Sequence, residues 1–291
     1  MLNIQSGSTT VKEYDFYRSA NTVTYPVSDT KRYTAIQMMG KDGKTYYWSP
    51  VNLGAIEIPT SVSGGNITTT CGKLYQWGRK EGFTNTNNST TTTTEKFDGK
   101  TDPLGFPTGE GALADMSPWN KKFIVYSSSN PNTQYNWLLF TEGADNPSGS
   151  SMQADAWYQK LWNLDEVAST TVDATKTARK TPYDPCPAGW RVPTMAEWVA
   201  IGADNTSTGK EFKNNLLTIN TTNGLQLILP AAGYRDYSDG SSYYQGSYGY
   251  YWSSSVPSGY TYARYVYFFS ATFIQYTYYR AFGFSVRCLQ E

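Results

Sequence analysis

The alternation of apolar and polar residues predicts short strands along much of the chain. Residues 33–55 read as two strands on either side of Asp42-Gly43, a pair typical of tight hairpin turns, with Trp48 as a buried anchor. Residues 73–80, KLYQWGRK, alternate as a half-buried strand does. Further strands are expected later in the chain, in LQLILPAAG, YYWSSS, ARYVYFFSA and GFSVRCL.

Two segments have the spacing of a helix instead. The first is QADAWYQKLWNLD, residues 153–165, where four apolar residues fall on one side: Ala154, Trp157, Leu161 and Leu164. The second begins after three closely spaced prolines. There Thr194 and Glu197 have the capping-box spacing, Trp198 and Ile201 then face inward, and Gly202 can end the helix.

The weakest patterning lies in residues 82–155. This stretch includes NTNNSTTTTTE and FTEGADNPSGSS, so we expect a polar insertion with little regular structure. Some of its residues are too apolar for a disordered tail, which favours packing against the core: Trp119, Phe123, Val125, Tyr126, Trp137, Leu138 and Phe140. Residues 1–32 are expected to form an N-terminal arm or strand, and residues 33–291 one domain.

Composition removes several classes of function. The 24 Lys and Arg residues balance the 24 Asp and Glu, and the basic residues are scattered, so nothing favours a nucleic-acid partner. The sequence has no histidine, which excludes a Ser-His-Asp, Cys-His or His-metal site built from this chain alone. No apolar stretch is long enough to span a bilayer, so we expect no membrane insertion. The N-terminus shows no secretory leader, and we expect a removed leader or export by another route. The low charge and abundant Thr, Ser, Asn, Gly and Tyr are typical of bacterial extracellular β-rich proteins.

Residues 231–289 hold more than half of the 25 tyrosines. Along FIQYTYY, residues 273–279, the aromatic residues have no clean period of two, so several rings must face solvent. Tyrosine gives a large contact area at low entropy cost and can still hydrogen-bond, as recognition surfaces require. We therefore predict a binding surface here; the alternative is a tyrosine-rich sheet that only packs.

Five motifs follow one another within residues 33–291: WSPVNL, LYQWGR, CPAGWRVPTMAEW, YWSSS and GFSVRC. In this order they resemble the motifs of the Fibrobacter succinogenes major paralogous domain found in many Bacteroidetes surface proteins. The resemblance implies an α+β, C-type-lectin-like fold, with small mixed or antiparallel sheets, two flanking helices and long irregular loops that present the ligand surface. The insertion would then lie inside this one domain.

A closer resemblance is to the variable proteins of diversity-generating retroelements, many of which use this fold. In those systems adenine-specific mutagenesis of Asn codons rewrites a C-terminal segment, so that Asn becomes Tyr, Phe, Ser, Thr, Ile, Val, Ala or Asp. Residues 234–282 consist largely of these residue types, and we interpret them as a variable ligand-binding segment. The resemblance assigns ligand binding to Tyr237, Tyr243, Tyr244, Tyr248, Tyr250, Tyr260, Tyr262, Tyr265, Tyr267, Phe269, Phe273, Tyr276, Tyr278, Tyr279 and Phe282.

The motif residues outside this set are expected to be structural. Trp190, Trp198 and Trp252 should be buried anchors with no catalytic role. The three cysteines are too far apart in sequence for a clustered metal site, and at most one pair can form. Cys186 and Cys288 lie in the two motifs most like the family's. Two alternatives stay equally open for them: a disulfide between the two residues, or two separate thiols. Cys71 would remain unpaired in the first case.

We expect no catalysis, no metal site and no cofactor. Calcium is the one cofactor weighed, because many lectins of this fold use it. The best oxygen cluster is Asp236, Ser238 and Asp239, but it does not have the EF-hand spacing, and a turn capped by Asp side chains is the preferred explanation.

The expected function is recognition, by an adhesin or receptor-binding protein on a cell surface or phage particle. Its partner would be a protein or glycan on another cell or host surface. One alternative is an oxidoreductase related to formylglycine-generating enzymes, which CPAGWRVPTMAEW also resembles, although these depend on reactive cysteines. Another is a structural fimbrial or stalk subunit, which would need a donor strand or a polymerisation groove.

Overall fold

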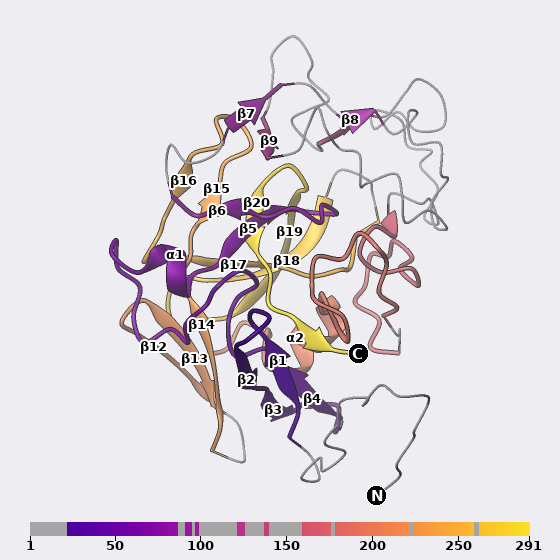
Figure 1. Ribbon diagram of the computed structural model, residues 1–291. Coiled ribbons are helices and arrows are strands. Elements are labelled where there is room, and N and C mark those ends of the chain that lie inside the picture. Colours follow the sequence, from indigo (N-terminus) through magenta and orange to yellow (C-terminus); the bar gives the residue numbers. More distant parts are fainter. Residues whose placement is uncertain are drawn as a thin grey trace, which may run out of the picture.

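Short strands dominate the computed structural model (Figure 1). The structure describes residues 22–86, 91–94, 97–98, 121–125, 137–139, 159–175, 178–220, 224–258 and 262–291. Within these ranges the chain forms small β-sheets and two short helices, a mixed α+β arrangement. Most of the predicted arm at 1–32 and much of the predicted insertion at 82–155 lie outside the described residues.

The largest sheet has eight strands and contains most of the chain from residue 234 onward (Figure 1). Strand β20 pairs with β15 and β17 along one side and with β5 along the other, so it lies inside the sheet. The order is β16-β15-β20-β17-β18-β19, with β6 beyond β5. The strands are β5 (Lys73–Gln76), β6 (Phe83–Thr84), β15 (Tyr234–Arg235), β16 (Ser242–Tyr243), β17 (Gly249–Trp252), β18 (Tyr262–Phe268), β19 (Ile274–Tyr279) and β20 (Gly283–Ser285).

Smaller sheets pack around this one. A four-stranded sheet has the order β11-β21-β4-β3, and a three-stranded sheet the order β12-β13-β14. Three further pairs are β1 with β2, β7 with β9, and β8 with β10. Their strands are β1 (Thr24–Pro26), β2 (Arg32–Thr34), β3 (Ile36–Met39), β4 (Thr45–Trp48), β7 (Thr91–Thr93), β8 (Phe97–Asp98), β9 (Lys122–Ile124), β10 (Leu138–Leu139), β11 (Trp190–Arg191), β12 (Lys210–Lys213), β13 (Leu216–Asn220), β14 (Gln226–Pro230) and β21 (Leu289–Gln290).

The elements set by local sequence form as predicted. Strands β3 and β4 pair around Asp42-Gly43, where Gly43 has a φ of 77°. Helix α2 (Met195–Ala200) begins at a complete capping box between Thr194 and Glu197. Helix α1 (Ile67–Thr70) is a single turn that the sequence pattern does not predict.

The helix predicted at 153–165 is wrong in its described part, which contains no α-helix from Gln159 onward. Asn163 pairs with Lys180 as an isolated bridge. The Asn163 Oδ1 also accepts hydrogen bonds from the N–H groups of Asp165 (3.1 Å) and Arg179 (3.0 Å). An Asn side chain that bonds nearby backbone in this way offers the chain an alternative to the helix.

A strand forms within the predicted range 73–80, at β5, but it is shorter and is not half-buried, because Leu74, Tyr75 and Gln76 are all buried. The Gln76 amide nitrogen donates to the carbonyls of Ile124 (2.9 Å) and Ala281 (2.8 Å). Both faces of the strand are thus covered, and its polar side chain is satisfied inside the core.

The closing motif GFSVRCL is not one strand but two, β20 and β21, which belong to different sheets. Between them the carbonyls of Val286 and Cys288 accept hydrogen bonds from the N–H groups of Leu53 and Ser49, each 2.9 Å long.

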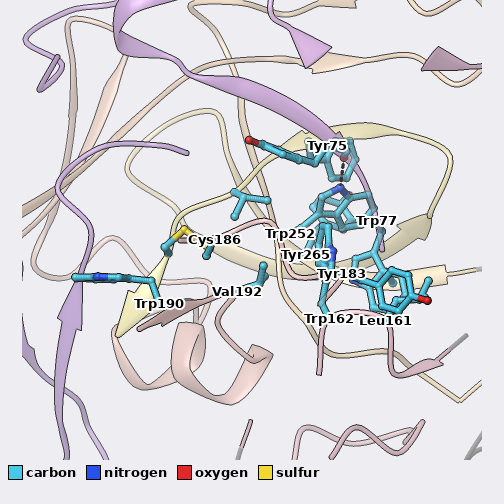
Figure 2. Close-up of a cluster of buried hydrophobic side chains, with 14 of the residues drawn as sticks. Tyr75, Trp77, Leu161, Trp162, Tyr183, Cys186, Trp190, Val192, Trp252 and Tyr265 are labelled. Carbon is cyan, nitrogen blue, oxygen red and sulfur yellow. Dashed lines mark hydrogen bonds between the residues drawn. A yellow bond between two sulfur atoms is a disulfide. The ribbon is translucent and has the colours of Figure 1, made fainter. Parts of the chain in front are cut away.

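The large sheet has a hydrophobic core on each face. One contains Trp252, whose Nε1 donates to the Tyr75 carbonyl at 2.7 Å (Figure 2). The other contains Trp48 and Trp198, with ring centroids 4.5 Å apart. Phe123, Val125 and Trp137 of the predicted insertion are also buried, as their apolar character favoured.

A buried arginine connects three sheets. Arg287 is fully buried and follows β20. Its guanidinium donates to the carbonyls of Ser49, after β4, at 2.9 Å and of Ile228, in β14, at 2.7 Å. Burial lowers the pKa of Arg287 to about 10, so it stays charged at neutral pH.

Candidate recognition surface

The hairpins formed by β17, β18 and β19 separate their side chains by face. Tyr250 lies directly opposite Tyr267, and Tyr265 lies opposite Tyr276. These four residues therefore share one face of the sheet. Residues of the opposite face, such as Val266, are fully buried against the core around Trp198.

Residues 234–248 add further rings to the aromatic face. The ring of Tyr234 lies 5.1 Å from that of Tyr250, and the ring of Tyr244 lies 4.9 Å from that of Tyr248. Tyr248 in turn lies 5.5 Å from Phe269, which joins this segment to the end of β18. We call the combined surface the aromatic plateau: Tyr234, Tyr237, Tyr243, Tyr244, Tyr248, Tyr250, Tyr267, Phe269, Tyr276 and Tyr278.

Half of the plateau residues are strongly exposed. Their exposed fractions are 58% for Tyr276, 55% for Tyr244, 47% for Phe269, 43% for Tyr243 and 37% for Tyr278. Large aromatic side chains that are both exposed and adjoining are uncommon on a protein that has no partner for them. The plateau therefore has the character of an interaction surface.

A buried layer supports these rings. Tyr265 is 6% exposed and Phe282 5%, and both pack against Phe284. Burial raises the pKa of the Tyr265 hydroxyl. Tyr265 and Phe282 were both predicted as ligand-binding residues, but little of either ring can be reached from solvent. The prediction is corrected for them, because their contacts are with the core.

Phe273 is a clearer error among the predicted binding residues. It is fully buried, and its ring lies 5.7 Å from that of Trp198 and 6.4 Å from that of Phe268. The turn between β18 and β19 carries it to the core side of the sheet. Pattern alone could not place it, because FIQYTYY has no clean alternation at its first residue.

The other predicted residues fall at the edge of the plateau or outside the described chain. Tyr262 and Tyr279 are half-buried and stack on each other at 5.1 Å. Tyr279 also lies 5.7 Å from Tyr237, at the plateau's rim. Tyr260 lies outside the described residues.

Tyr234 is a plateau residue that sequence reasoning missed. It contacts Tyr243, Tyr244, Tyr250 and several deeper rings. It is the first residue of the predicted variable segment, residues 234–282, but it was not among the residues assigned to ligand binding. Its place inside the tyrosine-rich stretch was the available signal.

The plateau itself contains no charged side chain. Burial raises the pKa of the Tyr234 hydroxyl to about 12, with a smaller contribution from Asp236. Burial also raises the pKa of Tyr250. These hydroxyls stay protonated at neutral pH and can both donate and accept hydrogen bonds.

Tyr244 holds an unfavourable backbone conformation, with a φ of 57°. A bulky residue is a genuine outlier in this left-handed region, whereas Asn adopts it more readily. The remaining non-glycine residues with positive φ in the described chain are Lys121, Asn205, Asn214 and Asn215. At Tyr244 the chain therefore uses an exposed tyrosine where it elsewhere mostly uses Asn.

The predicted structural residues lie beneath and beside the plateau. Trp198 and Trp252 are fully buried and Trp190 is 4% exposed. Cys186 and Cys288 form a disulfide, with Cα atoms 5.9 Å apart, and Cys71 is a buried free thiol. In Figure 2, Cys186 lies between Trp190 and the group around Trp252.

The carboxylates proposed as an oxygen cluster are used within a turn. Asp236 accepts from the Ser238 N–H at 2.8 Å, and Asp239 accepts from the Ser241 N–H at 2.7 Å and the Tyr243 hydroxyl at 2.9 Å. Within the described ranges no group of three or more Cys, Asp or Glu residues is placed to hold a metal ion. Nor does any described helix have the length and hydropathy needed to cross a bilayer.

A family model described as a domain of unknown function (DUF8237) matches residues 217–289. The match begins within β13, ends at the first residue of β21 and contains the whole plateau. No curated protein and no solved structure matches the chain significantly.

Proposed function

We propose that this chain is a non-catalytic recognition protein and that the aromatic plateau binds its partner. The observation that carries the proposal is the gathering of ten Tyr and Phe side chains on one face, with five of them exposed. The partner is a protein or glycan on another cell or host surface. The fold is of C-type-lectin type, and residues 234–282 carry the variable positions.

The physical reason lies in what such rings contribute to binding. Tyr supplies a large, rigid and amphipathic contact area at low entropy cost. Interface hot spots are enriched in Tyr, and truncating one commonly costs at least about 2 kcal/mol of binding energy. The plateau residues are uncharged, and their rings rest on the buried layer of Tyr265, Phe282 and Phe284. This packing orders the rings before a partner arrives, which lowers the entropy cost of binding.

The arrangement of frame and exposed residues supports a diversified surface. The motif residues Trp190, Trp252 and Cys288 are buried, while the exposed plateau residues can be replaced without opening the core. Tyr244 adds a local argument, since its left-handed backbone suits Asn, the residue that adenine-specific mutagenesis converts to Tyr. Stored backbone strain of this kind is typical of functional positions.

The cysteine chemistry favours recognition over the oxidoreductase alternative. Cys186 and Cys288 are bonded to each other, and burial raises the pKa of Cys71 to about 12. A thiol with that pKa is almost wholly protonated at neutral pH and reacts poorly. The disulfide also supports a location outside the cytosol, on a cell surface or phage particle.

The test replaces four exposed plateau residues together: Tyr243, Phe269, Tyr276 and Tyr278, each by Ser. Glycan arrays and immobilised cell-surface proteins are screened with the wild type, with and without a chelator. Whatever the wild type captures should be lost by the variant, while its free energy of unfolding changes by about 2 kcal/mol or less, since a single surface substitution usually changes it by about 0.5 kcal/mol at most. Chelator should make no difference.

Two controls separate surface from core. Met39→Ser with Ile56→Ser removes exposed apolar side chains away from the plateau and should leave binding intact. Tyr265→Ser should instead lower the free energy of unfolding by about 3 kcal/mol, as the truncation of a buried aromatic does. Full binding by the four-residue plateau variant would refute the proposal.

A further inference from the structure

Strand β19 is the outer strand of the large sheet among the residues that the structure describes. This strand is last in the sheet order, and β18 is its only neighbour within the described chain. Its sequence, IQYTYY, contains no charged residue and no proline. Those are the side chains with which proteins usually protect an edge from pairing with another strand.

The backbone hydrogen bonds of β18 show which N–H and C=O groups of β19 point away from the sheet. The Arg264 N–H donates to the Ser255 carbonyl at 2.9 Å, and the Arg264 carbonyl accepts from the Ser253 N–H at 3.0 Å, so both groups point away from β19. Backbone groups alternate along antiparallel strands, and Thr277 lies opposite Arg264. Thr277 and Gln275 therefore direct their own N–H and C=O groups outward, two donors and two acceptors at the spacing of a strand.

A hollow of about 440 Å³ adjoins this edge. Residues 170–172 line one side of it, and Arg264, Gln275, Tyr276 and Thr277 line the other. The loop is held in place because the Ser169 carbonyl accepts from the Arg264 guanidinium at 2.8 Å. The side chains of Gln275 and Thr277 lie on the face of β19 opposite the rings of Tyr276 and Tyr278, and Tyr276 adjoins both the hollow and the plateau.

The hollow has a positive lining. Arg264 is the one charged residue among the described residues that form it. The carboxylate of Glu166, which accepts from the Val256 N–H at 3.2 Å and from the Asn163 amide at 3.3 Å, acts on Arg264 electrostatically and offsets part of its charge, but it does not line the hollow. An acidic group that entered the hollow would meet a partly buried cation.

We infer that β19 receives an extended peptide segment of a partner protein as an added strand, with an Asp or Glu side chain of that segment directed into the hollow beside Arg264. Main-chain hydrogen bonds to Gln275 and Thr277 would provide affinity, and the hollow would select the side chain. A second copy of this chain fits less well, because its own β19 offers Gln and Thr rather than an acid on that side. The edge and the plateau share Tyr276 and Tyr278, but the edge binds through backbone groups and the plateau through rings, most of which lie outside β19.

The probe is a phage-displayed library of random linear peptides selected on the wild-type protein. Enriched peptides should share an acidic residue at a fixed position. Thr277→Pro should weaken a selected peptide by about tenfold, the equivalent of roughly one hydrogen bond, because it removes an outward N–H without breaking the ladder to β18. Thr277→Val keeps that N–H and is the matched control. Arg264→Gln should weaken binding similarly, and Arg264→Lys should retain most of it.

Amide hydrogen exchange in the wild type gives a readout that needs no variant. Adding a selected peptide should slow exchange at Gln275 and Thr277. A plateau variant changed only outside β19, Tyr243→Ser with Phe269→Ser, should bind the same peptide unchanged, which separates this inference from the proposed function. It is overturned if no peptide is enriched, if Thr277→Pro binds as well as Thr277→Val, or if exchange at the two amides is unaffected. A wild-type dimer that Thr277→Pro dissociates would also overturn it, since the occupant would then be a second copy.

Discussion

At the scale of single residues, tyrosines of one sheet occupy three different environments. Tyr251 is fully buried, and its hydroxyl donates to the Pro230 carbonyl at 2.7 Å. Tyr265 is buried beneath the plateau, and Tyr276 is 58% exposed upon it. Surroundings, rather than residue type, decide which of them can be replaced.

The strain at Tyr244 can be measured directly. Left-handed backbone costs a side-chain-bearing residue about 1–2 kcal/mol, and Asn pays less than Tyr. Tyr244→Asn should therefore raise the free energy of unfolding by about 1 kcal/mol in urea denaturation, less the small loss of ring contacts with Tyr234 and Tyr248. Tyr244→Val places a β-branched residue in the same conformation and should lower it. If Val proved more stable than Asn, backbone strain would not be the controlling term.

At the scale of elements, turn and capping signals were reliable, whereas hydrophobic spacing alone was not, as the helix predicted at 153–165 shows. The hairpin at Asp42-Gly43 and the capping box at Thr194 depend on residues within a few positions of each other, and both are present. The burial of Gln76 depends on Ala281, 205 residues away, which no alternation along β5 can show.

For the recognition surface too, the sequence predicts what depends on neighbouring residues and misses what depends on distant segments. Alternation along β18 correctly separates the aromatic face from the face of Val266, since that depends only on strand geometry. It could not show that Tyr265 lies beneath other rings, because those rings come from segments distant in the sequence. Tyr234 was missed for the same reason, since its neighbours Tyr250 and Phe284 become neighbours only in the folded sheet.

One loop, residues 181–192, is organised by the buried carboxylate of Asp184. It accepts from the N–H groups of Cys186 and Val192, each at 2.8 Å, and from the Lys180 ammonium at 3.2 Å. Burial raises the pKa of Asp184 from 3.8 to about 6, although Lys180 and the two N–H groups oppose the shift. A raised pKa means that folding favours the protonated acid. The contribution of Asp184 to stability is thus full below pH 3.8 and is lost as the pH rises through about 6.

Asp184→Asn cannot ionise, so it provides the comparison. The free energy of unfolding of the wild type, minus that of the variant, should fall between about pH 4 and pH 7. Carboxylates with lowered pKa, such as Asp204, change the stability of both proteins alike and cancel in this difference. Parallel stability curves across that range would show that Asp184 has an ordinary pKa in the folded protein.

At the scale of the whole molecule, the disulfide joins residues 102 positions apart. Closing a loop of about 100 residues removes enough entropy from the unfolded chain to stabilise the fold by roughly 4–5 kcal/mol in the simplest treatment. Replacing Cys186 and Cys288 together by Ala should lower the free energy of unfolding by about 2–5 kcal/mol. Reductant should destabilise wild type and Cys71→Ala equally and leave the double variant unchanged, which assigns the effect to this bond.

The division of GFSVRCL between two sheets has a consequence for how the protein is made. Strand β20 supplies the inner strand of the large sheet, and Cys288 reaches back to Ser49, 239 residues earlier. During synthesis the chain before residue 283 lacks this strand, the disulfide and Arg287, so its sheets cannot close around their cores. Pairings this distant in sequence form slowly. The exposed tyrosine-rich strands should therefore depend on a chaperone, or on completion of the chain, to avoid aggregation until residues 283–290 arrive.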